Sequence, residues 1–175
     1  MRFAFVALCL LALAACGQRP AQDAAATEPV LLVGEFKAAS DTARAISGDI
    51  RIERGGLLFS SGIVLFTRTL EPRRGSDVIS RDGDSYAAAA LGPADLVVEL
   101  RRVTDQTVPH SRVGLCGAQS VEYIALAYET RAQKVTALVF TGDEPPGPQA
   151  SRSRLCASYA FAPPAGARTT QGVVL

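Results

Sequence analysis

The fold is decided by the stretch Ile50-Arg51-Ile52-Glu53-Arg54-Gly55-Gly56-Leu57-Leu58-Phe59. In its first half, isoleucines alternate with charged residues, the period of two that is typical of a half-buried strand. The alternation resumes after the two glycines with Leu57 and Phe59 and continues to Ile63 and Leu65. Because a two-residue turn requires positive φ and glycine adopts it at little cost, the stretch predicts a β-hairpin that turns at Gly55-Gly56.

Strand signals recur on both sides of this hairpin. We expect strands in residues 30–36, 96–103 and 155–161, and a second hairpin made of residues 121–128 and 134–140. In the last strand, Leu155, Ala157, Tyr159 and Phe161 share one face, and Cys156 lies on the other. Residues 86–91 contain four alanines, which favour a helix, but the segment is too short to distinguish a helix from a closely packed strand.

Short strands separated by turn signals, without a sustained helical period, predict an all-β fold. We expect a small antiparallel β-barrel or sandwich of about seven or eight strands, and the sequence does not separate the two. The chain of 175 residues divides into a signal peptide (1–15), a lipidated cysteine with a flexible tether (16–29), a β domain (30–163) and a loose tail (164–175).

The N-terminal segment carries a targeting signal. A single basic residue, Arg2, precedes an apolar run over residues 3–13, and the run ends in Leu13-Ala14-Ala15-Cys16. A charged start, a short apolar core and small residues before a cleavage point are typical of a secretory signal peptide. The run is too short to span a bilayer, which needs about 20 residues. Cleavage after Ala14, as in an ordinary signal peptide, is the alternative.

The ending Leu13-Ala14-Ala15-Cys16 resembles the lipobox of bacterial prolipoproteins. This resemblance implies cleavage before Cys16, a diacylglycerol on its sulfur and an acylated amino terminus. It therefore implies a membrane anchor at Cys16, because two or three acyl chains bind a bilayer far more firmly than one. Gly17 stands where some inner-membrane lipoproteins have Asp, so we expect the outer membrane, with the domain facing the periplasm. The domain itself resembles small periplasmic lipoproteins.

The charge balance bears on the class of partner. The chain has 18 basic and 17 acidic residues, for a formal net charge of +1. Proteins that bind nucleic acids normally carry a surplus of basic residues. This chain is nearly neutral, so we expect no nucleic-acid partner.

Besides Cys16, the exported chain retains Cys116 and Cys156. In an oxidising compartment an even pair of cysteines is normally bridged, so we predict a Cys116–Cys156 disulfide. A redox pair and a metal site are the alternatives. The spacing differs from Cys-x-x-Cys, and the single histidine, His110, leaves a zinc site without a fourth ligand.

The sequence does not assemble a catalytic site. His110 is the only candidate imidazole base, and we expect it to be an ordinary residue of a surface loop. The chain has no Gly-x-Ser-x-Gly motif. Asp77, Asp82 and Asp84 suggest a calcium loop, but Ala88 occupies the position where such a loop has glutamate, so a turn is favoured. We expect no enzyme activity, no metal and no cofactor.

Two other charged features are candidates for a role. The loop Asp143-Glu144-Pro145-Pro146 is stiffened by its prolines, so it is a candidate contact surface for a protein partner, with a rigid soluble loop as the alternative. Glu99 and Arg101 share one face of a strand. They form a buried ion pair if that face points inward, and we expect the pair to be solvated.

These features predict a lipid-anchored envelope lipoprotein that binds a protein or another envelope component without catalysis. The alternative function is that of a small apolar-ligand carrier with a lipocalin-like barrel interior, which requires a cavity of several hundred Å³.

Overall fold

A computed structural model describes residues 31–167, 169–170 and 173–174, and the side chains as far as residue 167. In chain order, its elements are β1 (Gly34–Ala38), the π-helical turn η1 (Ala43–Ser47), β2 (Ile50–Glu53), β3 (Gly56–Phe59), β4 (Val64–Thr69), β5 (Arg73–Arg74), α1 (Tyr86–Ala90), β6 (Val97–Thr107), β7 (Tyr123–Tyr128), β8 (Val135–Thr141), β9 (Arg154–Ala162), β10 (Thr169–Thr170) and β11 (Val173–Val174).

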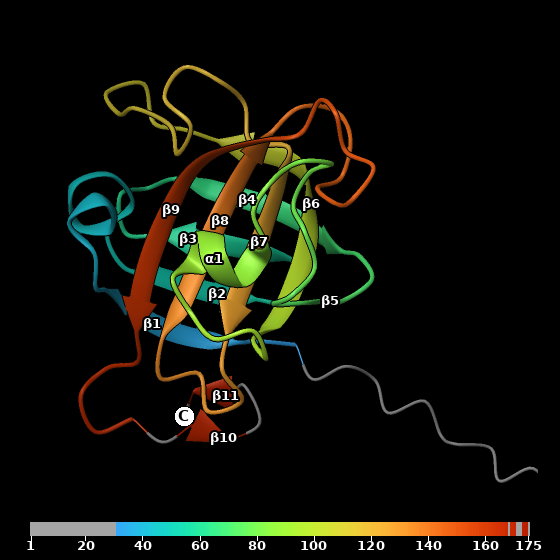
Figure 1. Cartoon of the computed structure of the whole chain (residues 1–175). Coiled ribbons are helices and arrows are strands. Elements are labelled where there is room, and N and C mark those ends of the chain that lie inside the picture. The colour runs from blue at the N-terminus through green and yellow to red at the C-terminus, as the bar shows by residue number, and fades with distance from the viewer. Residues whose placement is uncertain (1–30, 168, 171–172, 175) are drawn as a thin grey trace, which may run out of the picture.

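The main sheet closes on itself as an antiparallel barrel of eight strands (Figure 1). The strands follow one another as β4-β3-β2-β1-β9-β8-β7-β6, and β6 pairs again with β4. β5 continues alongside the start of β6. The predicted all-β antiparallel fold is confirmed, and of the two architectures left open by the sequence the barrel is correct. Closure satisfies the strand edges that an open sheet would expose.

The first hairpin forms as predicted, but its turn does not lie where the glycines suggested. β2 and β3 pair from Ile50 opposite Phe59 to Glu53 opposite Gly56, so the two turn residues are Arg54 and Gly55. Neither Gly55 nor Gly56 has a positive φ. Gly56 instead lies inside β3, where a Cβ atom would come within 3.1 Å of the Leu65 carbonyl oxygen. Close approach of β4 thus explains the second glycine.

One apolar cluster fills the barrel. It takes the inward-facing positions of each strand, for example Phe36, Ile52, Leu57 and Tyr159, all of which are almost completely buried. The alternation read in the sequence from Ile50 to Leu65 is therefore the alternation between barrel interior and solvent.

A second cluster lies outside the barrel wall. α1 packs across β7 and β8 (Figure 1), which resolves the ambiguity of residues 86–91 in favour of a helix. The Ser85 side chain caps the helix by accepting a hydrogen bond from the Ala88 N–H at 3.2 Å. Every residue of β7 is buried, as are all residues of β8 except its last, because these strands face the barrel interior on one side and the α1 layer on the other.

The barrel has two different ends. At the entry end, β1 begins and residues 31–33 run into the barrel, while β2 turns into β3 and β7 into β8. At the loop end lie the longer connections 108–122 and 142–153, drawn at the top of Figure 1. The tail that was expected to be loose includes the pairing of β10 with β11, which lies beyond the entry end.

Candidate functional site

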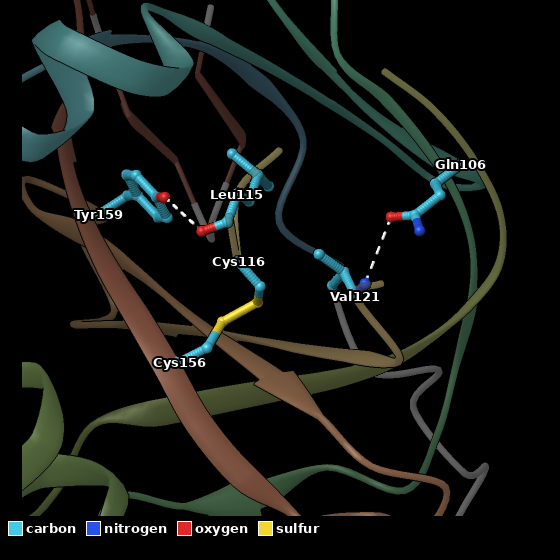
Figure 2. The surroundings of a disulfide bond; sticks show 6 residues. All are labelled: Gln106, Leu115, Cys116, Val121, Cys156 and Tyr159. Carbon is cyan, nitrogen blue, oxygen red and sulfur yellow. Dashed lines mark hydrogen bonds between the residues drawn. A yellow bond between two sulfur atoms is a disulfide. The ribbon is translucent and has the colours of Figure 1, made fainter. Parts of the chain in front are cut away.

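The predicted disulfide fastens the loop end. Cys116 and Cys156 are bridged, with their Cα atoms 5.5 Å apart. Figure 2 shows two further ties beside it. The Tyr159 hydroxyl donates to the Leu115 carbonyl oxygen at 2.6 Å, and the Val121 N–H donates to the side-chain oxygen of Gln106 at 3.3 Å. Residues 108–120 therefore form a fixed cover over this end of the barrel.

The outer side of this cover is exposed. His110 is solvent-exposed, as expected, and so is Arg112. Val113 projects with 64% of its surface accessible, and it lines an open pocket of about 400 Å³ together with Gln106 and residues 117–120. Its place in the lining of a pocket on a braced loop makes Val113 a candidate contact point for a partner.

The second loop of this end, residues 142–153, contains the predicted contact residues Asp143, Glu144, Pro145 and Pro146. Glu144 does not project toward a partner. Its carboxylate accepts hydrogen bonds from the backbone N–H groups of Ser151, Arg152 and Ser153. The N–H of Arg152, together with those of Ser151 and Ser153, holds the pKa of Glu144 below its usual value. Glu144 is thus an internal brace of the loop.

Pro145 and Pro146 differ in their exposure to solvent. Pro146 is buried, and its carbonyl oxygen accepts a hydrogen bond from the Tyr86 hydroxyl at 3.1 Å. The Tyr123 hydroxyl donates to the Asp143 carbonyl oxygen at 3.4 Å. Only Asp143 and Pro145 of the four are exposed, and the Asp143 carboxylate pairs with Arg152 at 2.9 Å. These bonds brace the loop, and its role in contact with a partner stays a prediction.

A β-bulge changes what the start of β9 presents. Val139 pairs with Ala157 and Phe140 with Leu155, so Cys156 is an extra residue without a partner on β8. The expectation that Leu155 shares the inward face of Ala157 is therefore wrong, because the bulge reverses the alternation at this point. Leu155 faces outward, 39% exposed, opposite Phe140 on β8.

Leu155 and Phe140 belong to the lining of a further hollow, which we call the wall pocket. It has a volume of about 420 Å³ and lies on the outer wall of the barrel, between residues 79–82 and residues 150–155. Two backbone hydrogen bonds join its sides: Gly147 N–H to the Ile79 carbonyl oxygen at 3.0 Å, and Arg81 N–H to that of Ala150 at 3.2 Å.

The pair Glu99 and Arg101 is not solvated, contrary to the expectation. Both side chains point into the barrel near its entry end, and Arg101 is completely buried. Its Nε donates to Glu99 Oε1 at 2.6 Å, and Nη1 donates to the Glu53 carbonyl oxygen at 2.6 Å and to Thr67 at 3.4 Å. Leu32 completes the arrangement, because its N–H donates to Glu99 Oε2 at 2.9 Å and its carbonyl accepts from Arg101 Nη2 at 3.4 Å. We call this arrangement the entry latch.

The sequence contained part of the signal for the entry latch. Glu99 and Arg101 share the parity of the inward-facing Val103, which indicated a common face. Leu32 and Glu53 contribute backbone groups. Because every residue carries such groups, the sequence does not indicate that these two residues take part. The position of the pair inside the barrel therefore depends on contacts that were not readable from the strand alone.

The packing of the interior bears on the carrier interpretation. Hollows of about 420, 400 and 260 Å³ open on the outer surface of the described residues. A hollow of about 30 Å³ has Glu99 and Tyr128 in its lining and is far smaller than a carrier requires. The inward-facing side chains form the buried cluster and the entry latch. Burial raises the pKa of the inward-facing Tyr128 to about 12. This packing does not favour a ligand inside the barrel.

Other predicted features have simple positions. The Asp82-Gly83-Asp84 turn is closed by a β-bridge between Val78 and Ser85. Within the described residues, no group of three or more His, Cys, Asp or Glu side chains is arranged to hold a metal ion. Among the same residues, no helix is long and apolar enough to cross a membrane. Cys16 lies outside the described residues.

The fold defines a class: a closed, eight-stranded antiparallel β-barrel with one disulfide and a helix packed on its outer wall. Comparison with protein-family models, with curated proteins and with solved structures finds no match.

Proposed function

We propose that this protein is a lipid-anchored envelope lipoprotein that acts by non-catalytic binding of a protein or another envelope component. The proposal rests on one observation: the chain enters the barrel at one end, which is held by the entry latch, and the fixed loops lie at the opposite end. An acylated Cys16 would attach the entry end to the membrane, so the loop end would face away from it.

The tether limits the distance between the domain and the membrane. Residues 16–29 span at most about 50 Å when fully extended, at roughly 3.5 Å per residue. The proposed location is the outer membrane, with the domain on the periplasmic side, and the proposed partner is a protein of the envelope. A tether of this length keeps the loop end within the layer next to the membrane.

The rigidity of the loop end supports a binding role. The disulfide, the Tyr159 bond to Leu115 and the Glu144 brace hold both long loops before any partner arrives. Binding then costs little loop-ordering entropy, which is the main advantage of a preorganised surface. The exposed Val113 and Pro145 are the side chains that we expect to touch the partner.

Photo-crosslinking in living cells tests the proposal. A benzoylphenylalanine is placed at Val113 or Pro145 in the full-length lipoprotein, with Arg54 in the entry-end turn as the matched control position. We expect the same crosslinked protein from both loop-end positions, its loss in a Cys16→Ser background, and none from Arg54. Equal crosslinking at all three positions, or none at any, would contradict a specific contact surface at the loop end.

A further inference from the structure

We propose that the wall pocket binds a peptide segment in which a carboxylate lies beside an apolar side chain. This inference rests on the proposed binding function and names the chemistry of the partner at one part of the loop end. It is carried by the lining of the pocket, by its charges and by its rigidity.

The floor of the pocket is apolar and accessible. The bulge at Cys156 turns Leu155 out of the barrel, where it remains 39% exposed opposite the buried Phe140 of β8. Ile79 adds a partly buried apolar side chain from the opposite side. An exposed leucine next to a second apolar side chain in a concave lining is a favourable seat for one apolar side chain of a partner.

The rim of the pocket carries two exposed guanidinium groups. Arg81 and Arg154 are both exposed, and neither has a carboxylate within ion-pair distance among the described residues. Arg154 Nη1 donates to the carbonyl oxygens of Ser151 at 2.6 Å and Ser153 at 2.8 Å, which holds the guanidinium at the rim. Asp82 is the only acidic side chain in the lining, and the nearby carboxylate of Glu144 is already engaged by the N–H groups of Ser151, Arg152 and Ser153. Guanidinium groups at a rim favour a carboxylate on the partner.

The remaining polar groups favour a peptide over an acyl chain. Ser80 and Ser151 contribute hydroxyls to the lining. A hydrocarbon chain would cover these groups without satisfying them, which is unfavourable. A peptide backbone brings donors and acceptors of its own, and a fatty acid is therefore the alternative that the test must exclude.

The pocket is also preformed. Its two sides are joined by the backbone hydrogen bonds from Gly147 to Ile79 and from Arg81 to Ala150, and Glu144 braces residues 151–153. A rigid hollow on a fixed loop retains its shape before binding, so specificity follows from its lining.

The test is a selection from a displayed library of random heptapeptides on the purified, lipidated protein in detergent. The Arg81→Glu variant is screened in parallel, and no peptides are discarded on the basis of that screen. We expect enrichment of sequences with Asp or Glu within two residues of an aromatic or branched apolar residue. Arg81 is exposed and its side chain makes no described hydrogen bond, so the variant should fold normally.

The best peptide is then labelled with fluorescein and measured by fluorescence anisotropy. We expect affinity to fall at least tenfold with Arg81→Glu, with Leu155→Ser, or when the acidic residue of the peptide is replaced by its amide. Arg54→Glu, the same charge change at the entry end, should alter affinity less than twofold. Laurate should not displace the peptide.

Four results would overturn the inference: no enriched peptides, enriched peptides without acidic residues, equal binding by the Arg81→Glu variant, or displacement by laurate. If loop-end crosslinking at Val113 and Pro145 persists alongside any of them, the wall pocket inference fails while the proposed binding function stands. If the crosslinks are lost while the peptide still binds, the proposed contact surface at the loop end fails and peptide binding by the wall pocket stands.

Discussion

Replacing Arg101 with methionine tests the energetic role of the entry latch. The guanidinium is completely buried and is bonded to Glu99, to Thr67 and to the carbonyl oxygens of Glu53 and Leu32. Methionine is apolar and somewhat smaller, and it removes the donors while keeping much of the packing. It leaves the carboxylate of Glu99 inside the barrel with the Leu32 N–H as its one remaining described donor.

The size of the effect follows from that stranded charge. Removing one partner of a buried ion pair costs about 3–5 kcal/mol, because the other charge loses its compensation. The carbonyl groups of Glu53 and Leu32 also lose a hydrogen bond. We include their cost in the same range, because water can reach them from the nearby barrel end. With a urea slope of about 2 kcal/mol/M for a domain of this size, the unfolding midpoint should fall by roughly 2 M.

The assay is urea unfolding of the Cys16→Ser form, followed by circular dichroism, with Arg102→Met as the matched control. Arg102 is the next residue of β6, is exposed and faces outward. We expect the control to change the free energy of unfolding by less than about 0.5 kcal/mol. A cost below about 1 kcal/mol for Arg101→Met would refute the reasoning. Hydrogen exchange at the Leu32 amide, which should accelerate in this variant, gives an independent measurement.

Three further predictions concern other parts of the fold. Replacing Cys116 and Cys156 together with serine should lower the free energy of unfolding by about 2–4 kcal/mol and speed hydrogen exchange in residues 108–120, as measured by calorimetry and mass spectrometry; unchanged exchange would show that the other ties suffice. Because the folded-state pKa of Glu144 is lowered, its stabilising contribution is present above the unfolded-state pKa and lost as pH falls through the folded-state value. The stability difference between wild type and Glu144→Gln should therefore be largest near neutral pH and should shrink in acid, and a difference independent of pH would contradict the brace. Burial raises the pKa values of Tyr86 and Tyr128 to about 12, so their protonated phenols favour the folded state, and this contribution is lost as pH rises from 10 through 12. Absorbance at 295 nm should show these phenols ionising well above pH 10 or together with unfolding, and titration of all four tyrosines near pH 10 in a folded protein would contradict it.

Much of the architecture was predictable because the strands are strongly patterned. The alternation from Ile50 to Leu65 identified the first hairpin, and the continuous apolar runs of β7 and β8 identified the second. The disulfide followed from the number of cysteines and the expected compartment. Barrel closure was not predictable, because an alternating strand has the same two faces in a barrel and in a sandwich.

The errors lie where one residue's position depends on distant backbone. The bulge at Cys156 inserts a single residue into a regular pattern, and nothing in the side chains of Leu155 or Ala157 indicates it. The solvated state expected for Glu99 and Arg101 was wrong because Leu32 and Glu53 supply main-chain partners from sequence-distant segments. In the candidate site, Glu144 looked like a contact residue because its backbone partners could not be seen.

The pairing of β1 with β9 has a consequence for how the chain acquires its fold. Lys37 and Ala38 lie opposite Ala162 and Phe161, so closure joins residues separated by most of the domain. Bringing such distant segments together costs about 4 kcal/mol of chain entropy, which must be spent before the contacts of the closed wall compensate for it. The barrel is therefore expected to close late, after both four-stranded meanders have formed. A chain that emerges from its N-terminus onward cannot complete its native state until Ala162 has emerged. A truncation before β9 would leave β1 and β8 as open edges prone to intermolecular pairing.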